Sequence, residues 1–117
     1  MPYEGGIRVP LIVKWPGHTK AGSKCDVAVN GIDFYPTLVG MAGGKVEQTL
    51  DGEDISCLFE GDDKNFKSRD LFWHFPAYLE ANRKSGMNFR ATPYSIVRSG
   101  EWKLIYFYET SEVELYN

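Results

Sequence analysis

The stretch at residues 7–15 restricts the folds open to this chain more than any other part of the sequence. It is rich in β-branched and apolar residues, many of which follow one another instead of alternating with polar ones. Such a pattern is typical of a strand covered on both faces, as in the interior of an α/β sheet. Gly5-Gly6 before it permits a tight turn, and Pro16-Gly17 would end the strand. Few other segments of the 117 residues could supply neighbouring strands, so we expect a piece of a larger protein.

A helix is predicted after this first strand. Apolar residues recur at helical spacing between Asp33 and Gly43, and Pro36 is tolerated in the first turn of such a helix. Asp33 suits an N-cap or first-turn position, because its carboxylate can accept hydrogen bonds from free amide groups. Residues 26–29 predict either a short strand or a lead-in to this helix, and residues 55–59 predict one or two helical turns.

The last third of the chain predicts a small antiparallel sheet. Residues 94–98 and 102–108 alternate aromatic or β-branched side chains around a short glycine turn, which is the pattern of a β-hairpin. Residues 71–75 and 113–116 predict one further strand each. Residues 78–91 are mixed and charged, and they predict a long loop of the kind that is often functional in compact domains.

Composition and charge exclude several classes of function. The hydrophobic content of 43% and the charged content of 25% are ordinary for a globular protein. A formal net charge of -3 gives no electrostatic footprint for nucleic acid, and no apolar run reaches the roughly 18 residues that a membrane span needs. Cys25 and Cys57 lack the spacing of a metal site. We expect two free, partly buried thiols, with a disulfide as the alternative if the two meet in space.

Several stretches, taken in order, resemble one known family. They are residues 3–17, which open with Tyr-Glu-Gly-Gly, residues 33–38, Ala42-Gly43, Asp51-Gly52, residues 71–76, residues 97–105 and Leu115-Tyr116-Asn117. In this order they resemble the type I sulfatases of the alkaline-phosphatase superfamily. The resemblance covers nearly the whole chain, and its first motif is highly specific. Phosphonate and phosphate monoester hydrolases of the same superfamily share similar stretches and are the alternative.

The resemblance implies a fold class and a division of the chain. The chain would be an α+β fragment, the C-terminal portion of a sulfuric ester hydrolase. Residues 1–45 would supply a strand and a helix to the edge of an alkaline-phosphatase-like α/β domain, and residues 46–68 would be a connector with a short helix. Residues 69–117 would form the antiparallel C-terminal subdomain, truncated at its end. Related enzymes mostly work outside the cytoplasm, so we expect a periplasmic or secreted parent.

The chemistry of the family has no counterpart in this sequence. Type I sulfatases oxidise the Cys or Ser of a Cys/Ser-x-Pro-x-Arg motif to formylglycine, whose hydrate attacks sulfur. Neither Cys25, nor Cys57, nor any serine lies in such a motif, and the Asp and Asn ligands of the family's divalent metal, calcium, are missing as well. Sulfate ester cleavage needs a nucleophile and positive charge beside the developing oxyanions. We therefore expect no catalytic residue and no metal ligand here, and no activity from this chain alone.

The resemblance also suggests which residues meet the substrate, because the C-terminal subdomain of such enzymes leans over the active-site pocket. His74 is the first candidate, since a histidine can hydrogen-bond a sugar hydroxyl or protonate a leaving oxygen. Asn88 and Arg90 are weaker candidates for contacts with hydroxyl groups or anions. The alternative for all three is a structural or solvated side chain without substrate contact. Tyr106, Phe107 and Tyr108 indicate packing first and stacking on a sugar second.

The expected partners follow from the same reasoning. They are the missing N-terminal catalytic portion of the same chain and a sulfated sugar or aryl sulfate, with no nucleic acid and no membrane. A self-standing, non-catalytic carbohydrate-binding module is the alternative from a different class. The apolar stretch at residues 7–15 argues against it, because a self-sufficient small module rarely leaves so much apolar surface uncovered. An isolated chain would self-associate through this stretch or leave it poorly ordered.

Overall fold

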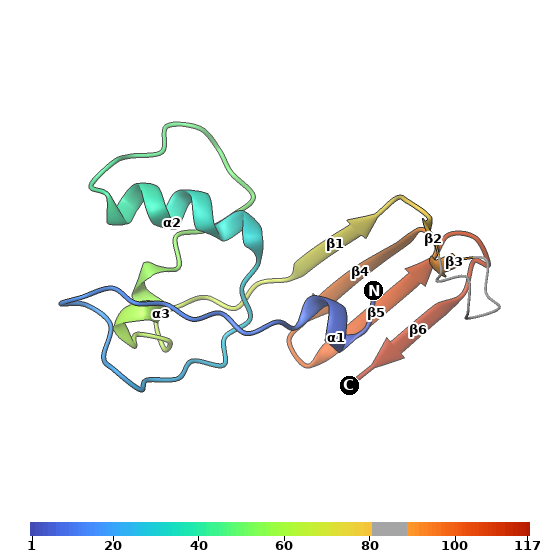
Figure 1. The fold of residues 1–117 in the computed structure, drawn as a ribbon, viewed down its shortest axis with the longest axis horizontal. Coiled ribbons are helices and arrows are strands. Elements are labelled where there is room, and N and C mark those ends of the chain that lie inside the picture. The colour runs from blue at the N-terminus through green and yellow to red at the C-terminus, as the bar shows by residue number, and fades with distance from the viewer. Residues whose placement is uncertain (81–88) are drawn as a thin grey trace. The chain divides into compact units, whose positions relative to one another are not determined.

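The computed structural model describes residues 1–80 and 89–117 and divides the chain into two compact units. One unit combines Met1–Pro10 with Ser68–Asn117, and the other consists of Leu11–Lys67. The ribbon in Figure 1 shows a sheet in the first unit and helices in the second. The α+β class expected from the sequence is therefore confirmed.

The first unit is built on a four-stranded antiparallel sheet. Its strands are β1 (Leu71–Phe75), β4 (Tyr94–Ser99), β5 (Trp102–Phe107) and β6 (Val113–Tyr116), in the order β1-β4-β5-β6. The predicted hairpin is the pair β4–β5, in which Ser99 lies opposite Trp102 across the turn. The predicted strands at residues 71–75 and 113–116 add to its two sides. All four strands predicted for the last third of the chain are thus confirmed.

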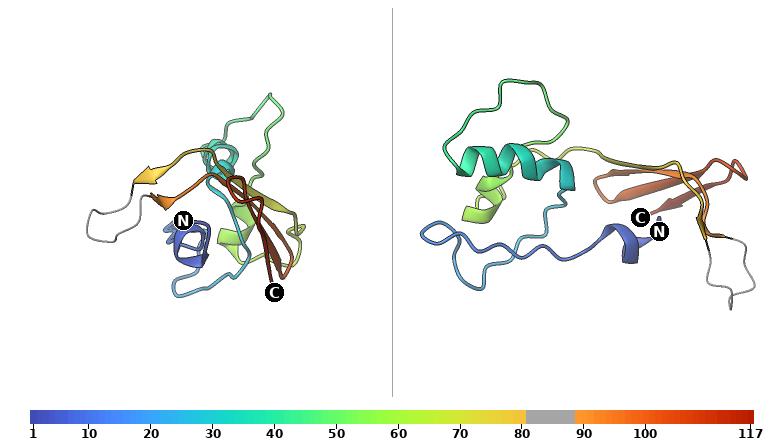
Figure 2. Two further views of the ribbon diagram at one scale, coloured as in Figure 1. Left: turned by 90° about the vertical axis from the view of Figure 1, so that its right-hand side faces the viewer. Right: turned by 45° about the horizontal axis from the view of Figure 1, so that its top comes forward.

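Two short strands form where the sequence predicted only a loop. Strand β2 (Leu79–Glu80) pairs with β3 (Phe89–Ala91) in a separate two-stranded sheet with an irregular register. Figure 2 shows this pair at the end of the unit away from the β4–β5 turn. Strands of two or three residues are too short to show a period-2 pattern, so the alternation of side chains could not reveal them.

One face of the larger sheet carries the core of the first unit. Ile96 and Ile105 are opposite each other in the β4–β5 register and are almost fully buried, together with Tyr94 on the same face. Four further side chains, those of Ile7, Trp73, Phe75 and Phe107, pack against this cluster. The short N-terminal helix α1 (Glu4–Ile7) supplies Ile7 and lies over this face in both Figure 1 and Figure 2. Strand alternation thus separates a buried face from a solvent-facing one.

Polar contacts fix the N-terminal segment to strands β5 and β6. The ammonium of Lys103, only 9% exposed as a residue, donates a hydrogen bond to Glu4 Oε1 over 2.6 Å. The carboxylate of Glu114 accepts one bond from the Tyr3 hydroxyl at 3.2 Å and another from the Tyr116 hydroxyl at 2.6 Å. The Tyr-Glu part of the Tyr-Glu-Gly-Gly motif therefore anchors the start of this unit to the sheet.

The pKa values in this anchor follow from its hydrogen bonds. The bond from Lys103 stabilises the carboxylate of Glu4 and lowers its pKa. The bond to the Glu114 carboxylate favours the neutral phenol of Tyr116 and raises its pKa to about 12. Burial, followed by the bond to Glu114, raises the pKa of Tyr3. Each shift therefore favours the protonation state that completes the anchor.

The strand predicted over residues 7–15 does not form within this chain. Ile7 ends helix α1, and residues 8–15 form neither helix nor strand. Val9, Leu11 and Ile12 face solvent, with Val9 70% and Ile12 92% exposed. A strand needs neighbours that take up its backbone hydrogen bonds, and no segment of the described chain pairs with these residues. Pro10 within the stretch lacks an N–H group, which disfavours a central strand.

The second unit contains the predicted helix. Helix α2 (Phe34–Met41) follows a 3-10 turn, η1 (Gly31–Asp33), and helix α3 (Ser56–Glu60) forms over the segment predicted to be helical. Both helices are confirmed, whereas residues 26–29 form no strand and lead into η1.

Asp33 holds this unit together from a fully buried position. Its carboxylate accepts the backbone N–H of Asn30 at 2.7 Å and that of Glu53 at 3.1 Å. The hydroxyl of Thr37 donates to the Asp33 carbonyl at 2.6 Å and accepts the N–H of Ile55, the N-cap of α3, at 3.0 Å. Asp33 thus takes up amide donors as predicted, although the donors precede α2 and lie in a distant loop.

Close packing holds the Asp51-Gly52 turn against the backbone of η1. A Cβ atom added to Gly52 would lie 2.1 Å from the carbonyl oxygen of Ile32. Only glycine permits this approach of the two backbones, and it brings the Glu53 amide to the Asp33 carboxylate.

Candidate functional site

His74 lies on the solvent-facing side of the larger sheet. The side chains of β1 alternate, so that Leu71 on one side is buried while Phe72 and His74 on the other are exposed. Ser95 of β4 is the direct cross-strand partner of His74, and its Oγ lies 2.8 Å from His74 Nδ1. Cross-strand neighbours on one face lie close enough for their side chains to interact, which accounts for this contact.

Tyr108 completes a hydrogen-bonded chain of three side chains. Its hydroxyl lies 2.9 Å from Ser95 Oγ, and its ring meets the His74 ring edge to face, with the centroids 5.7 Å apart. The Tyr108 ring also meets that of Tyr106 edge to face at 5.0 Å. The backbone N–H of Tyr108 donates to the Pro93 carbonyl at 3.1 Å, which fixes the residue just beyond the end of β5.

We call His74, Ser95, Tyr106 and Tyr108 the His74 cluster. It presents an imidazole, three hydroxyl groups and aromatic edges on the solvent-facing side of the sheet. Such a mixture of hydrogen-bonding groups and flat rings is suited to a ligand with both hydroxyl or ester oxygens and an apolar ring face. Tyr106 and Tyr108 lie in this cluster, whereas Phe107 between them packs against the core.

Ser95 was not among the residues predicted for the site. The sequence identified His74 by its chemistry and the hairpin by its alternation, but the pairing of β1 with β4 joins segments that are 21 residues apart at this position. Nothing in residues 71–75 specifies that register. A search for polar residues on the outward face of the hairpin would have found Ser95, because it shares parity with Val97 and Ser99 on β4.

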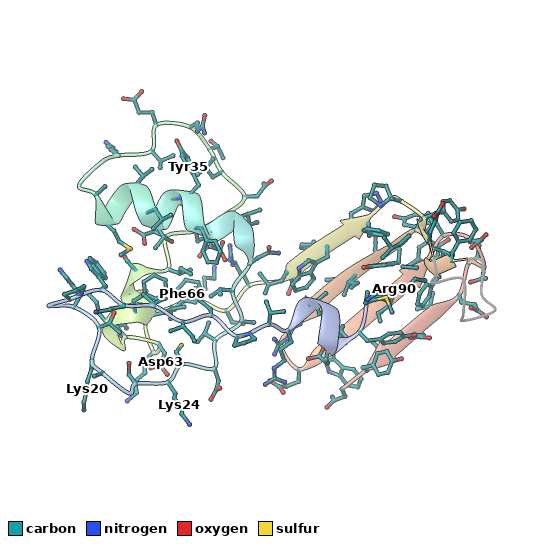
Figure 3. All side chains as sticks on the ribbon, in the orientation of Figure 1. Lys20, Lys24, Tyr35, Asp63, Phe66 and Arg90 are labelled. Carbon is teal, nitrogen blue, oxygen red and sulfur yellow. The ribbon has the colours of Figure 1, made fainter. Side chains whose placement is uncertain are left out.

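Of the other two predicted contact residues, the structure describes only Arg90. Arg90 is exposed on β3, and its side chain is labelled in Figure 3. Within residues 1–80 and 89–117, no hydrogen bond or ion pair links Arg90 to the His74 cluster. Asn88 lies outside the described residues. The roles predicted for both residues stay predictions.

The described residues do not provide the metal or the nucleophile of a sulfatase. Among residues 1–80 and 89–117, no three His, Cys, Asp or Glu side chains gather in a way that could hold a metal ion. Cys25 and Cys57 are both free, and burial raises the pKa of the Cys57 thiol, which disfavours a reactive thiolate. The roles of calcium and formylglycine in the parent stay predictions. In the same described part, every helix is too short or too polar for crossing a membrane.

A family model matches this chain along its whole length, and known proteins match most of it. Residues 1–117 match the family described as "N-sulphoglucosamine sulphohydrolase, C-terminal". A sulfatase of Formosa agariphila is 40% identical over 98% of this chain, which corresponds to 21% of that protein. Human arylsulfatase A is 34% identical over 93% of the chain and 19% of its own length. Human steryl-sulfatase is 39% identical over 69% of the chain and 14% of its own length.

The chain spans about a fifth or less of the length of these relatives. The family match covers all of it, and the ordered motifs from the Tyr-Glu-Gly-Gly segment to the last strand lie within that match. The chain therefore belongs to the type I sulfatases, of which it represents a C-terminal portion.

Proposed function

We propose that this chain is the C-terminal portion of an enzyme that hydrolyses sulfate esters. The observation that carries the proposal is the family match over all 117 residues, which the 40% identity to a sulfatase over 98% of the chain supports. The parent would cleave a sulfated sugar or an aryl sulfate. A phosphate or phosphonate monoester hydrolase of the same superfamily is the competing outcome of the test.

The catalytic step would take place in the part of the parent that precedes this segment. That part would supply the formylglycine nucleophile and the calcium site, for which the described residues contain no fitting group. The segment alone would be inactive. Its partner would be the catalytic portion of the same chain, against which the sheet unit would be held in place.

Within this arrangement, His74 would contact the group that carries the sulfate. Its ring is exposed, is held by Ser95 and Tyr108, and lies among aromatic edges that could receive a ring of the substrate. A histidine placed in this way could hydrogen-bond a sugar hydroxyl or the ester oxygen of the leaving group. Asn88 and Arg90 would be secondary contacts from the neighbouring segment.

The experiment compares two substrates in the full-length parent. His74→Ala should lower kcat/KM for a sulfated sugar by up to about tenfold more than for a small aryl sulfate, because one neutral hydrogen bond contributes about 0.5–1.5 kcal/mol. His18→Ala is the matched control, since His18 lies in the other unit, stacked on Trp15 and bonded to Glu60. An equal loss on both substrates, or none, would remove His74 from the substrate contact.

Two further measurements test the parent activity itself. The gene sequence upstream of this segment should encode a Cys/Ser-x-Pro-x-Arg motif and the acidic metal ligands. An aryl phosphate assayed beside the aryl sulfate separates the two monoester chemistries. A full-length parent that lacks the motif, or that prefers the phosphate, would refute the sulfatase proposal.

A further inference from the structure

We infer that Ser95 and Tyr108 are positioning residues which fix the His74 ring with Nε2 outward, as a hydrogen-bond donor to an oxygen of the ligand. The inference rests on the proposed role of His74 at the substrate, and it selects one of the two roles open to that residue. Three observations support the inference: the hydrogen-bond distances among His74, Ser95 and Tyr108, the ring contacts of Tyr108, and the backbone contacts that hold these residues.

The three residues are held independently of their side-chain contacts. His74 and Ser95 face each other in the β1–β4 ladder, and Ser95 also faces Tyr106 across β4–β5. Tyr108 follows β5 and is attached to the Pro93 carbonyl, two residues before Ser95 on the adjoining chain segment. The backbone thus delivers the two hydroxyl groups to His74, so that little side-chain freedom is lost when the hydrogen bonds form.

The acidity of the two hydroxyl groups indicates which atom donates in each hydrogen bond among Tyr108, Ser95 and His74. A phenol is a more acidic hydroxyl than an aliphatic alcohol, with an ordinary pKa of about 10, and is the better donor of the two. The Tyr108 hydroxyl therefore donates to Ser95 Oγ, which lies 2.9 Å away. The proton of Ser95 then remains available for His74 Nδ1, 2.8 Å away, and in the inferred arrangement Nδ1 accepts it. A neutral imidazole that accepts at Nδ1 carries its own proton on Nε2.

This arrangement leaves Nε2 of the His74 ring to meet a ligand. Nδ1 is occupied by Ser95, and within the described residues no hydrogen bond is made to Nε2. The edge-to-face contact with Tyr108 at 84° between the ring planes restricts rotation of the imidazole about its attachment. A fixed Nε2–H group suits the hydroxyl or ester oxygen of a sulfated ligand. It would bind that oxygen in the ground state, whereas proton donation to a leaving group would require an imidazolium.

The first test reads the tautomer directly. In the full-length parent labelled with ¹⁵N-histidine, the signals of His74 are identified by their loss in His74→Gln. The wild-type protein should show a protonated Nε2 and a hydrogen-bonded, unprotonated Nδ1. Ser95→Ala should shift the Nδ1 resonance and introduce the second tautomer, Tyr108→Phe should do so to a smaller extent, and Ser99→Ala should leave it unchanged. A protonated Nδ1 in the wild-type protein, or His74 signals that ignore Ser95→Ala, would overturn the inference.

The second test measures the effect on substrate binding. Ser95→Ala and Tyr108→Phe should raise KM for the sulfated sugar about 2- to 10-fold, with a smaller change in kcat, as expected for one misplaced neutral hydrogen bond. Ser95→Thr keeps the hydroxyl and should restore KM, whereas Ser95→Ala combined with His74→Ala should be no worse than His74→Ala alone. Unchanged KM in both hydroxyl variants would refute the positioning role.

The two tests separate this inference from the proposed function. If His74→Ala leaves kinetics unchanged but the tautomer responds to Ser95 and Tyr108, the substrate contact is wrong and the orientation of the ring is right. If His74→Ala selectively lowers kcat/KM for the sulfated sugar but the His74 tautomer is unchanged in Ser95→Ala, the substrate contact is right and the positioning role is wrong.

Discussion

Replacing Glu4 by glutamine should destabilise the protein more than replacing its partner, Lys103, by methionine. The Lys103 side chain is only 11% exposed, whereas that of Glu4 is 58% exposed. Glu4→Gln leaves a nearly buried ammonium without its counter-charge. Lys103→Met removes the ammonium, keeps the aliphatic stem in the core, and leaves a carboxylate that water already reaches. The asymmetry in burial therefore predicts an asymmetry in cost.

The cost of Glu4→Gln in free energy of unfolding lies between two known limits. Exposed ion pairs contribute about 0.2–1 kcal/mol, and breaking a buried pair costs about 3–5 kcal/mol. Solvent screens the Glu4 end of this pair, so we expect Glu4→Gln to cost about 1–2 kcal/mol and Lys103→Met to cost less than about 1 kcal/mol. Each kcal/mol corresponds to about 4–8 °C in Tm for a domain of 60–100 residues. Arg8→Met is the control, since Arg8 lies 3.8 Å from Glu4 but is 77% exposed, and its loss should be nearly neutral.

Urea and thermal denaturation are measured for the wild type, Glu4→Gln, Lys103→Met and the variant that combines the two changes. Together these four proteins give a complete double-mutant cycle. In the Lys103→Met background, Glu4→Gln should cost almost nothing, because the charge that it leaves unpaired is no longer there. The hydrogen bond from Lys103 lowers the pKa of Glu4 in the folded protein below its unfolded value. The stability that it contributes is therefore present above the unfolded pKa of about 4.3 and is lost as the pH falls through the folded pKa. Equal costs for the two single variants, or a larger cost for Lys103→Met, would refute the reasoning.

Three further predictions concern the core, the buried hydroxyl and a titration. Ile105→Ala should cost about 2–5 kcal/mol in urea denaturation because Ile105 is fully buried, whereas Leu115→Ala on the exposed face should cost less than about 0.5 kcal/mol; similar costs would contradict the assignment of faces. Thr37→Val should cost about 1–3 kcal/mol, since it leaves the N-cap amide of α3 without its acceptor, while Thr37→Ser should restore most of the stability. Tyr116 should ionise only near pH 12 in an ultraviolet titration, and Glu114→Gln should lower that midpoint. Because folding raises the pKa of Tyr116, the hydrogen-bonded phenol contributes stability below the unfolded pKa of about 10. That contribution is lost as the pH rises through the folded pKa.

The elements with local signals could be predicted from the sequence. The β4–β5 hairpin follows from alternating side chains around a short glycine turn, and helix α2 follows from apolar spacing between Asp33 and Gly43. Each signal lies within about 15 residues of chain and needs no knowledge of distant partners. The ordered motifs likewise indicated the sulfatase family without any structure. In the candidate site, His74 could be named because its residue type alone is informative.

Long-range pairing could not be read from the sequence, because a residue's partners depend on which segments meet. Residues 8–15 have the composition of a buried strand, but strand formation requires neighbours, and the described chain offers them none. Ser95 is an ordinary strand residue until the register of β1 on β4 places it 2.8 Å from His74. The sequence by itself determined the elements that have local signals, and the family. Only the tertiary structure decided which face of the sheet is buried, which side chains gather on the other face, and which apolar segment remains uncovered, because register and burial are properties of pairs of segments.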